Sequence, residues 1–204
     1  MKRIADIAAS IEYRGTQWSE AAERTLDGWF PSLLARLIFL AVLFGYYWNS
    51  ALTKIGEGPL GFLEITDSAY IQILPSVMEA NGYDSSSIAF IPWGLIATLG
   101  TWFEFLLPIL IVIGLFTRLA ALGMLVFIAV QSFVDIAFHG VDAETIGALF
   151  DRFPSSTIVD QRTLWAFLLV TLVVKGGGAI SLDAFIRRTL RARTAVAETL
   201  SPSH

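Results

Sequence analysis

The chain has 204 residues, of which 55% are hydrophobic, and its mean hydropathy of +0.64 lies above the usual range of soluble globular proteins. It contains no cysteine, which excludes disulfides, thiolate metal sites and cysteine nucleophiles. With two histidines and a formal net charge of −4, no haem, metal or nucleotide cofactor and no nucleic-acid partner are expected. The composition indicates an all-α integral membrane protein, a four-helix transmembrane bundle with interfacial amphipathic helices.

Residues 1–32 are predicted to form a cytoplasmic or interfacial segment. The first 13 residues lack the apolar stretch of a cleavable signal peptide. Trp18, Leu26 and Trp29 fall near one face of a helix, which would lie in the membrane interface before Pro31. The alternative is a solvated tail with scattered aromatic residues.

Four apolar segments are predicted to span the membrane within residues 33–180, at about 33–52, 91–115, 119–138 and 158–178. The segments 91–115 and 119–138 form a hairpin with a short polar turn. The last apolar run, 163–174, is short enough to be a buried or re-entrant segment instead. It spans if Ile158 and Val159 extend it on one side and Ala179 and Ile180 on the other.

Two long connections, 53–90 and 139–157, are predicted to be external. In the first, Tyr70, Leu74 and Met78 recur at helical spacing around Pro75, which predicts one kinked or two short helices on the membrane surface. Residues 181–204 form a basic amphipathic segment suited to an anionic leaflet, with Ser181 as its helix cap. The glycine triplet 176–178 is interpreted as a flexible break.

The distribution of basic residues predicts that both termini are cytoplasmic. With four spans, one side receives Lys2, Arg3, Arg14, Arg24, Arg36, Arg118, Lys175, Arg187, Arg188, Arg191 and Arg193, and the other only Lys54, Arg152 and Arg162. A fourth segment that did not span would force the C-terminal arginines across the membrane.

Glu104 is the one acidic residue near the middle of a predicted span. Intramembrane carboxylates mark proton paths, ligand sites or buried ion pairs. Pro108 lacks the amide that would bond the Glu104 carbonyl, so a kink is expected there. The alternative for Glu104 is a structural ion pair or a protonated, hydrogen-bonded acid. Arg36, Lys54 and Arg118, near span ends, are equally interpretable as topology anchors.

Polar residues of three spans are expected at the external end of the bundle: Trp48, Asn49, Lys54, Gln131, Asp135, His139 and Arg162. Gln131, Asp135 and His139 are spaced i, i+4 and i+8, which places them on one stripe of a helix. This stripe is predicted to face the bundle above Glu104, with Asp135 paired to Lys54 or Arg162. The alternative is a wetted rim at the headgroup level.

The sequence shows no phosphate-binding loop, nucleophile elbow or dinucleotide fingerprint, so no catalytic residue is predicted. Three features together resemble the DoxX family of small bacterial four-span membrane proteins over about Leu33 to Ile186. They are the first span with Arg36 and Lys54, the hairpin from Glu104 with its Gly-x-x-Thr-Arg-x-Ala-Ala turn, and the closing glycine triplet. The closing motif of the family usually reads Gly-Pro-Gly, and Gly177 stands in the proline position.

The resemblance implies a bacterial inner-membrane protein that interacts with quinone or serves as an accessory subunit of a membrane redox complex. Its partners would be the lipid bilayer and a redox-complex protein or a second copy of the chain. The residues expected to contact a quinone are Glu104, Arg36, Trp48, Lys54, Gln131, Asp135 and His139. The alternative function is a non-enzymatic assembly or scaffold factor that binds a client through its external helices. Whether the protein is an enzyme stays open.

Overall fold

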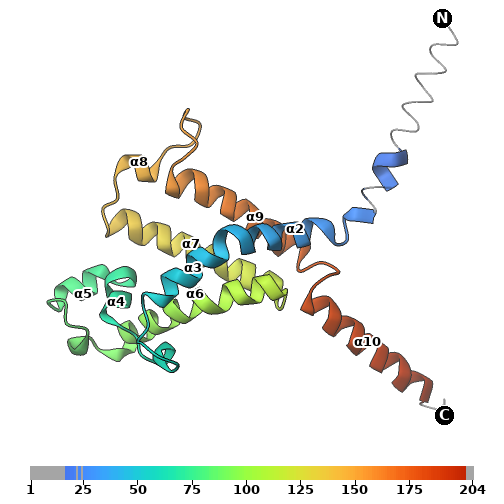
Figure 1. The fold of residues 1–204 in the computed structure, drawn as a ribbon, viewed down its shortest axis with the longest axis horizontal. Helices are drawn as coiled ribbons and strands as arrows, with labels where there is room; N and C mark the ends of the chain where they lie inside the picture. The colour runs from blue at the N-terminus through green and yellow to red at the C-terminus, as the bar shows by residue number, and fades with distance from the viewer. Residues whose placement is uncertain (1–16, 22, 24, 201–204) are drawn as a thin grey trace, which may run out of the picture.

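The computed structural model describes residues 17–21, 23 and 25–200, with side chains to residue 194 (Figure 1). Expectations for the first 16 residues, for Arg24 and for the last residues of the C-terminal segment lie outside the described part. The described part is helical without a β-strand, as predicted, and contains four helices long and apolar enough to cross a membrane.

The first long helix runs from Phe30 to Leu52 and comprises α2 (Phe30–Phe39), a π-helical turn (Leu40–Phe44) and α3 (Gly45–Leu52). It begins three residues before the predicted span because Pro31 is accommodated in its first turn, where the missing amide would have no helical partner. The second is a π-helical turn (Phe90–Gly94) with α6 (Leu95–Ile113), and the third is α7 (Thr117–Ala137).

The fourth long helix joins a π-helical turn (Thr157–Gln161) to α9 (Arg162–Lys175). The short apolar run is therefore lengthened at its start, through Ile158 and Val159, as predicted. It is not lengthened at its end: the helix stops at Lys175, because Gly176 adopts a positive φ of 75°. The expected extension through Ala179 and Ile180 is therefore wrong.

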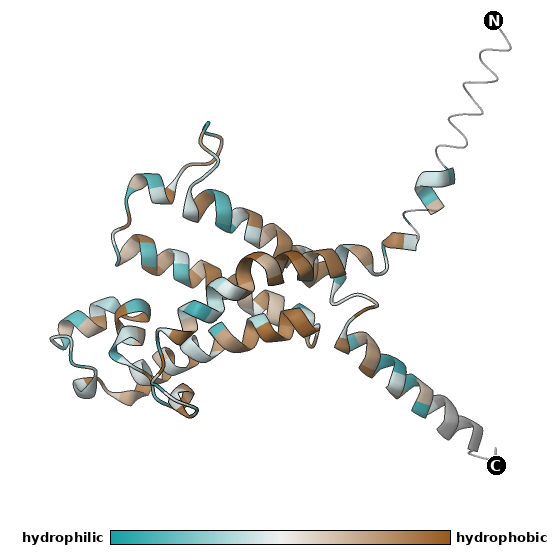
Figure 2. Ribbon diagram, viewed as in Figure 1, coloured by the Kyte–Doolittle hydropathy of each residue, from teal (hydrophilic) through white to brown (hydrophobic). Residues whose placement is uncertain are grey.

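The long helices pack with α9 against α7 and α2, and with α6 against α3 and α7. Their common core contains Phe39, Leu43, Tyr47, Ile111, Met124, Leu169 and Leu172. Many other apolar side chains of these helices are exposed on the outside of the bundle, and hydrophobic residues predominate along the long helices (Figure 2). Such an apolar exterior matches the hydrocarbon region of a bilayer.

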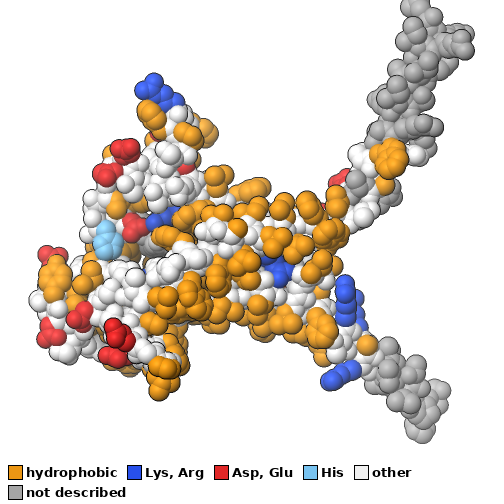
Figure 3. Space-filling model, in the orientation of Figure 1, with side chains coloured by type: hydrophobic (Ala, Val, Ile, Leu, Met, Phe, Trp, Pro, Cys, Tyr) orange, Lys and Arg blue, Asp and Glu red, His pale blue; other side chains and the backbone are white. Residues whose placement is uncertain are grey.

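Short helices occupy the connections at one end of the bundle (Figure 1). The first connection holds α4 (Asp67–Ile73) and α5 (Pro75–Ala80), so the predicted break at Pro75 is confirmed and gives two helices. The second holds α8 (Ala143–Ile146). Acidic side chains gather at this end, and apolar ones cover the bundle between the two ends (Figure 3).

The opposite end carries the α6–α7 hairpin turn and α10 (Leu182–Leu200), which extends away from the bundle. Asp183, at the start of α10, caps α7: its carboxylate accepts hydrogen bonds from the Phe116 and Thr117 amides at 2.8 and 3.0 Å and from the Thr117 hydroxyl at 2.8 Å. Burial raises the pKa of Asp183, but the hydrogen bonds from Thr117 and Phe116 outweigh it and hold the pKa below its usual value.

At the same end of the bundle, Arg36 of α2 connects the end of α6 to the turn after α9. Its guanidinium donates to the carbonyls of Ile111 at 3.0 Å and Val112 at 2.5 Å, at the end of α6, and to those of Gly177 at 3.2 Å and Ile180 at 2.5 Å after α9. These carbonyls end helices or lie in a turn, so they have no complete helical bonding of their own.

The glycine triplet after α9 is closely packed, which corrects its interpretation as a flexible break. A Cβ on Gly177 would lie 2.6 Å from the Thr117 hydroxyl oxygen and 2.8 Å from the Ser181 Cβ. Ser181 caps α10 as predicted, because its hydroxyl accepts from the Ala184 amide at 3.1 Å.

Candidate functional site

A cavity of about 820 Å³ lies between α6 and α7 and reaches the end of the first span. Its walls are apolar side chains, Ile96, Leu99, Phe103 and Leu107 on α6 and Leu119, Leu122, Val126 and Val130 on α7. Several of these remain solvent-accessible, with Val126 58% and Val130 55% exposed. Because these positions belong to membrane-spanning helices, the cavity opens sideways toward the hydrocarbon of the bilayer.

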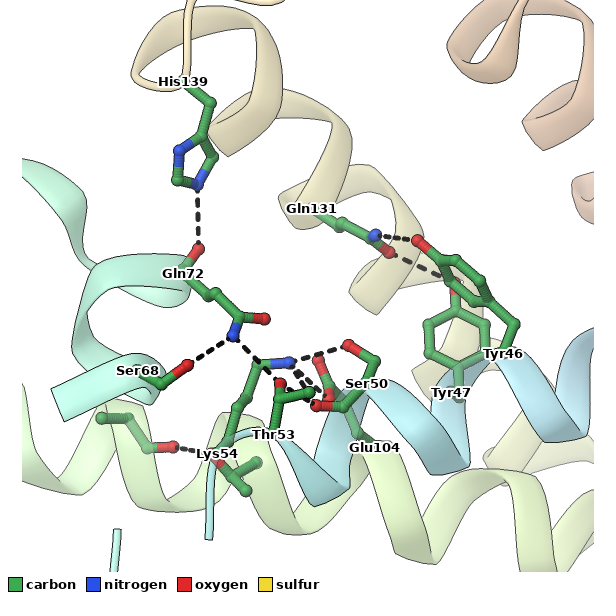
Figure 4. A network of polar contacts seen from close by, with 12 residues as sticks. Tyr46, Tyr47, Ser50, Thr53, Lys54, Ser68, Gln72, Glu104, Gln131 and His139 are labelled. Atoms are coloured by element: carbon green, nitrogen blue, oxygen red, sulfur yellow. Dashed lines mark hydrogen bonds and ion pairs between the residues drawn. The ribbon is translucent and has the colours of Figure 1, made fainter. Parts of the chain in front are cut away.

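Lys54 and Glu104 form a buried ion pair at the polar end of the cavity (Figure 4). Lys54 Nζ lies 2.9 Å from Glu104 Oε2, and the two side chains are only 2% and 6% exposed. Lys54 Nζ also donates to the carbonyl and hydroxyl oxygens of Ser50, at 3.0 and 2.8 Å. Three partners use the three protons of the ammonium group, which compensates part of its desolvation.

This pair gives Glu104 the ion-pair partner that was one of the alternatives for it. Glu104 is held in an ion pair, and its partner Lys54 is buried rather than reaching the interface as a topology anchor. Lys54 lies in the turn that follows α3, directly after the C-cap Thr53. Its ammonium group therefore contacts both the last turn of α3, at Ser50, and Glu104 on α6.

Gln131, Asp135 and His139 face the bundle, as their spacing predicts. Gln131 donates from Nε2 to the Tyr46 hydroxyl at 3.0 Å and accepts from the Tyr47 hydroxyl at 3.3 Å (Figure 4). All three stripe residues line the cavity.

Two contacts join the outer part of this stripe to other elements. The predicted partner of Asp135 is confirmed as Arg162, with 2.5 Å between Oδ2 and Nη2, and Arg162 also donates to the Ser132 hydroxyl at 2.8 Å. His139 Nε2 lies 3.2 Å from the carbonyl oxygen of Gln72 in α4. The stripe therefore connects α7 to α9 and to the first connection.

Two of the sequence-predicted residues are not brought to the cavity. Arg36 is at the other end of the bundle, where its donors are occupied by four backbone carbonyls. Trp48 packs its ring on Phe44 and Phe105, with centroids 5.5 and 5.0 Å away, and does not line the cavity. Trp48 was assigned by its depth in the membrane, and depth does not specify the face of a helix. Arg36 was expected only from the family resemblance, as a hydrogen-bond donor for a quinone.

Three polar residues at the cavity were missed from the sequence: Tyr46, Ser50 and Gln72. A signal for two of them was present, because Tyr46, Ser50 and Lys54 are spaced i, i+4 and i+8, like the stripe on α7. Gln72 lies on α4 and donates to the hydroxyls of Thr53 and Ser68 at 3.0 and 2.8 Å. No local pattern indicates that α4 covers this end.

The Tyr46 hydroxyl keeps a donor. It accepts from Gln131, and in the described part of the chain no acceptor takes its own proton. The same part of the chain holds no group of three or more His, Asp or Glu side chains placed for a metal ion. Chemically, the cavity offers apolar walls, a free hydroxyl donor and a nearby ammonium charge.

Four apolar spans, with a cavity between α6 and α7 that opens sideways, define a multi-pass helical membrane protein. The DoxX family model matches residues 32–140, more than half of the chain, and the chain therefore belongs to the DoxX family. The matched region contains every residue that lines the cavity, from Tyr46 to His139. No curated protein and no solved structure matches the chain.

Proposed function

We propose that this protein binds a quinone in the cavity between α6 and α7, as an accessory subunit of a membrane redox complex. The observation that carries the proposal is the combination of a lateral opening at hydrocarbon depth with a polar end. A quinone has a flat apolar ring, an apolar tail and two carbonyl acceptors, and it resides in the bilayer. It therefore needs apolar walls, one or two donors and an entrance from the lipid.

The headgroup would lie at the polar end, with one carbonyl oxygen accepting from the Tyr46 hydroxyl. Lys54 already uses its three protons on Ser50 and Glu104, whereas the Tyr46 hydroxyl keeps its proton for an entering carbonyl. The ammonium charge of Lys54 would favour an electron-rich carbonyl oxygen. The apolar tail would lie between Phe103 and Val126 and leave through the lateral opening.

The sequence carries no cofactor-binding motif, so the proposal places the electron donor in a partner protein. By the asymmetry of basic residues, both termini would be cytoplasmic, and the end with α4, α5 and α8 would face outward from a bacterial inner membrane. The partner would then dock on these connections, next to the polar end of the cavity.

A titration of the detergent-purified protein with a short-chain benzoquinone, followed by calorimetry, tests the proposal. Val130→Phe places a ring in the cavity and should abolish saturable binding. Val170→Phe is the matched control, because Val170 is 47% exposed on α9 and does not line the cavity. Loss of binding in Val130→Phe alone supports the proposal; saturable binding that survives in Val130→Phe, or no binding to the wild type, contradicts it.

The alternative, an assembly factor that grips a client protein, is favoured by one observation. Leu149, Phe150 and Phe153 are exposed together in the second connection, at 62%, 102% and 60%. Exposed apolar clusters of this kind mark interaction surfaces. If Phe150→Ser with Phe153→Ser loses a protein that co-purifies from native membranes, and the wild type does not bind quinone, the assembly role replaces the quinone role.

A further inference from the structure

A second hollow, of about 350 Å³, lies at the opposite end of the bundle from the cavity. It forms where the start of α7, the glycine turn after α9 and the start of α10 meet. Three basic residues line it, Arg118, Lys175 and Arg187, together with Asp183 and the neighbouring residues Phe116, Thr117, Leu119, Gly176 and Gly177. No residue of this hollow except Leu119 takes part in the proposed quinone site.

The local charges leave this hollow positive. Asp183 already accepts three hydrogen bonds from the start of α7, and Lys175 pairs with Asp27 at 2.5 Å. Arg118 donates to the Val174 carbonyl at 3.1 Å. Among the described residues neither Arg118 nor Arg187 forms a salt bridge, although the carboxylate of Asp183 interacts with Arg187 through space. Three basic side chains against the carboxylates of Asp183 and Asp27 leave one positive charge, and both guanidinium groups keep hydrogen-bond donors for an anion.

The rim of the hollow is apolar. Phe116 and Leu119, which line the hollow beside the basic side chains, are 62% and 68% exposed. These positions lie at the ends of membrane spans, where lipid headgroups and the first methylenes of acyl chains are found. Leu119 lines both the hollow and the quinone cavity, so an acyl chain leaving the hollow would run directly onto the apolar wall of α7.

We propose that this hollow binds the phosphate of an anionic phospholipid, with Arg118 and Arg187 contacting the phosphate oxygens. Guanidinium groups bind phosphate through two parallel hydrogen bonds, and basic pockets between membrane helices accept anionic headgroups. The acyl chains lie over Phe116 and Leu119. The start of α7 is not the recognition element, because Asp183 already caps it.

Native mass spectrometry of the full chain tests this site. The protein is titrated in detergent with phosphatidylglycerol and with phosphatidylcholine of the same acyl chains. The double variant Arg118→Gln with Arg187→Gln should lower phosphatidylglycerol affinity by roughly tenfold or more, since it removes charge-assisted hydrogen bonds to the phosphate oxygens. The control double variant, Arg152→Gln with Arg188→Gln, removes two exposed arginines outside the hollow and should change affinity less than about twofold.

Equal phosphatidylglycerol retention by the two double variants would overturn the site and leave only a nonspecific charge effect. Inorganic phosphate is the second arm: if it displaces the lipid and binds the delipidated protein equally well, the ligand is a free phosphate and the lipid proposal fails. If the double variant does not fold, the single variant Arg187→Gln replaces it in the experiment. Arg187 is exposed on α10, so its substitution should leave the fold intact. This single variant must still weaken phosphatidylglycerol binding.

Discussion

Replacing the buried pair of Lys54 and Glu104 gives the sharpest stability prediction. The two side chains are 2% and 6% exposed and 2.9 Å apart, so removal of one leaves the other charge buried without its partner. Each of Glu104→Leu and Lys54→Met should therefore lower the free energy of unfolding by about 3–5 kcal/mol. If the two effects were independent, the double variant would lose about 6–10 kcal/mol.

The double variant, Lys54→Met with Glu104→Leu, should instead unfold close to the wild type, because two apolar side chains replace the pair and no buried charge remains. Unfolding by SDS titration of the protein in mixed micelles measures all four stabilities. The control is Lys175→Met with Asp27→Leu, a pair whose side chains are 40% and 58% exposed and whose single variants should each cost less than about 1 kcal/mol. Single variants of the buried pair as stable as the wild type, or a double variant that loses the full sum, would refute the reasoning.

Three further predictions concern the hairpin end. Arg36→Leu should lower the free energy of unfolding by about 3 kcal/mol or more, since four carbonyls lose a charged donor. Quinone binding by the folded protein should not change. Arg36→Lys should not restore stability, because an ammonium group cannot replace the planar guanidinium donors. Gly177→Ala should cost about 1–3 kcal/mol in the same assay, because its Cβ meets Thr117 and Ser181, whereas Gly45→Ala, with open space around it, should be neutral or stabilising. Asp183→Asn should cost about 0.5–2 kcal/mol at pH 7, because both carboxylate oxygens accept hydrogen bonds and the amide nitrogen of Asn cannot accept one. The pKa of Asp183 is depressed in the folded state, so the wild type should lose the stability contributed by the ionised carboxylate as pH falls from about 4 through the folded pKa. Plots of unfolding free energy against pH for the wild type and Asp183→Asn should therefore converge at low pH. Parallel plots would contradict this.

The four spans were predictable because hydrocarbon thickness sets the length of an apolar helix. The ambiguous fourth span also had a local start signal. The Ser156 hydroxyl accepts from the Asp160 amide at 3.1 Å, and the Asp160 carboxylate accepts from the Ser156 amide at 2.8 Å. This reciprocal bonding begins the helix ahead of the apolar run. The end of the span was predicted too late because Gly176 adopts a left-handed φ that stops the helix.

The candidate site was predictable only where residues repeat along one helix. Gln131, Asp135 and His139 share a stripe, and a stripe of polar residues must face the bundle, so their inward orientation followed from spacing. The pairing of Glu104 with Lys54 did not follow in the same way. The rotation of α6 relative to α3 decides that Glu104 meets Lys54, 50 residues away, and side-chain packing sets that rotation.

The role of Arg36, donating hydrogen bonds to backbone carbonyls at helix ends, could not be predicted from the side chains in the sequence. Its partners are backbone carbonyls 75 to 144 residues away, and every residue type carries a carbonyl. An arginine near a span end therefore looks the same in the sequence whether it contacts lipid, ligand or a helix end. The tight packing of Gly177 is hidden for the same reason, since it depends on Thr117 and Ser181 of other elements.

Site-resolved photo-crosslinking tests the central proposal, quinone binding between α6 and α7, most directly. The protein is reconstituted in lipid nanodiscs with a photoreactive quinone analogue, and the labelled peptides are mapped with and without excess unlabelled quinone. The account predicts labels on Phe103, Val126 and Val130, removed by competition and lost in Val130→Phe but not in Val170→Phe. Labels spread evenly over the lipid-facing residues, including Leu164 and Val170 on α9, and insensitive to competition, would contradict it.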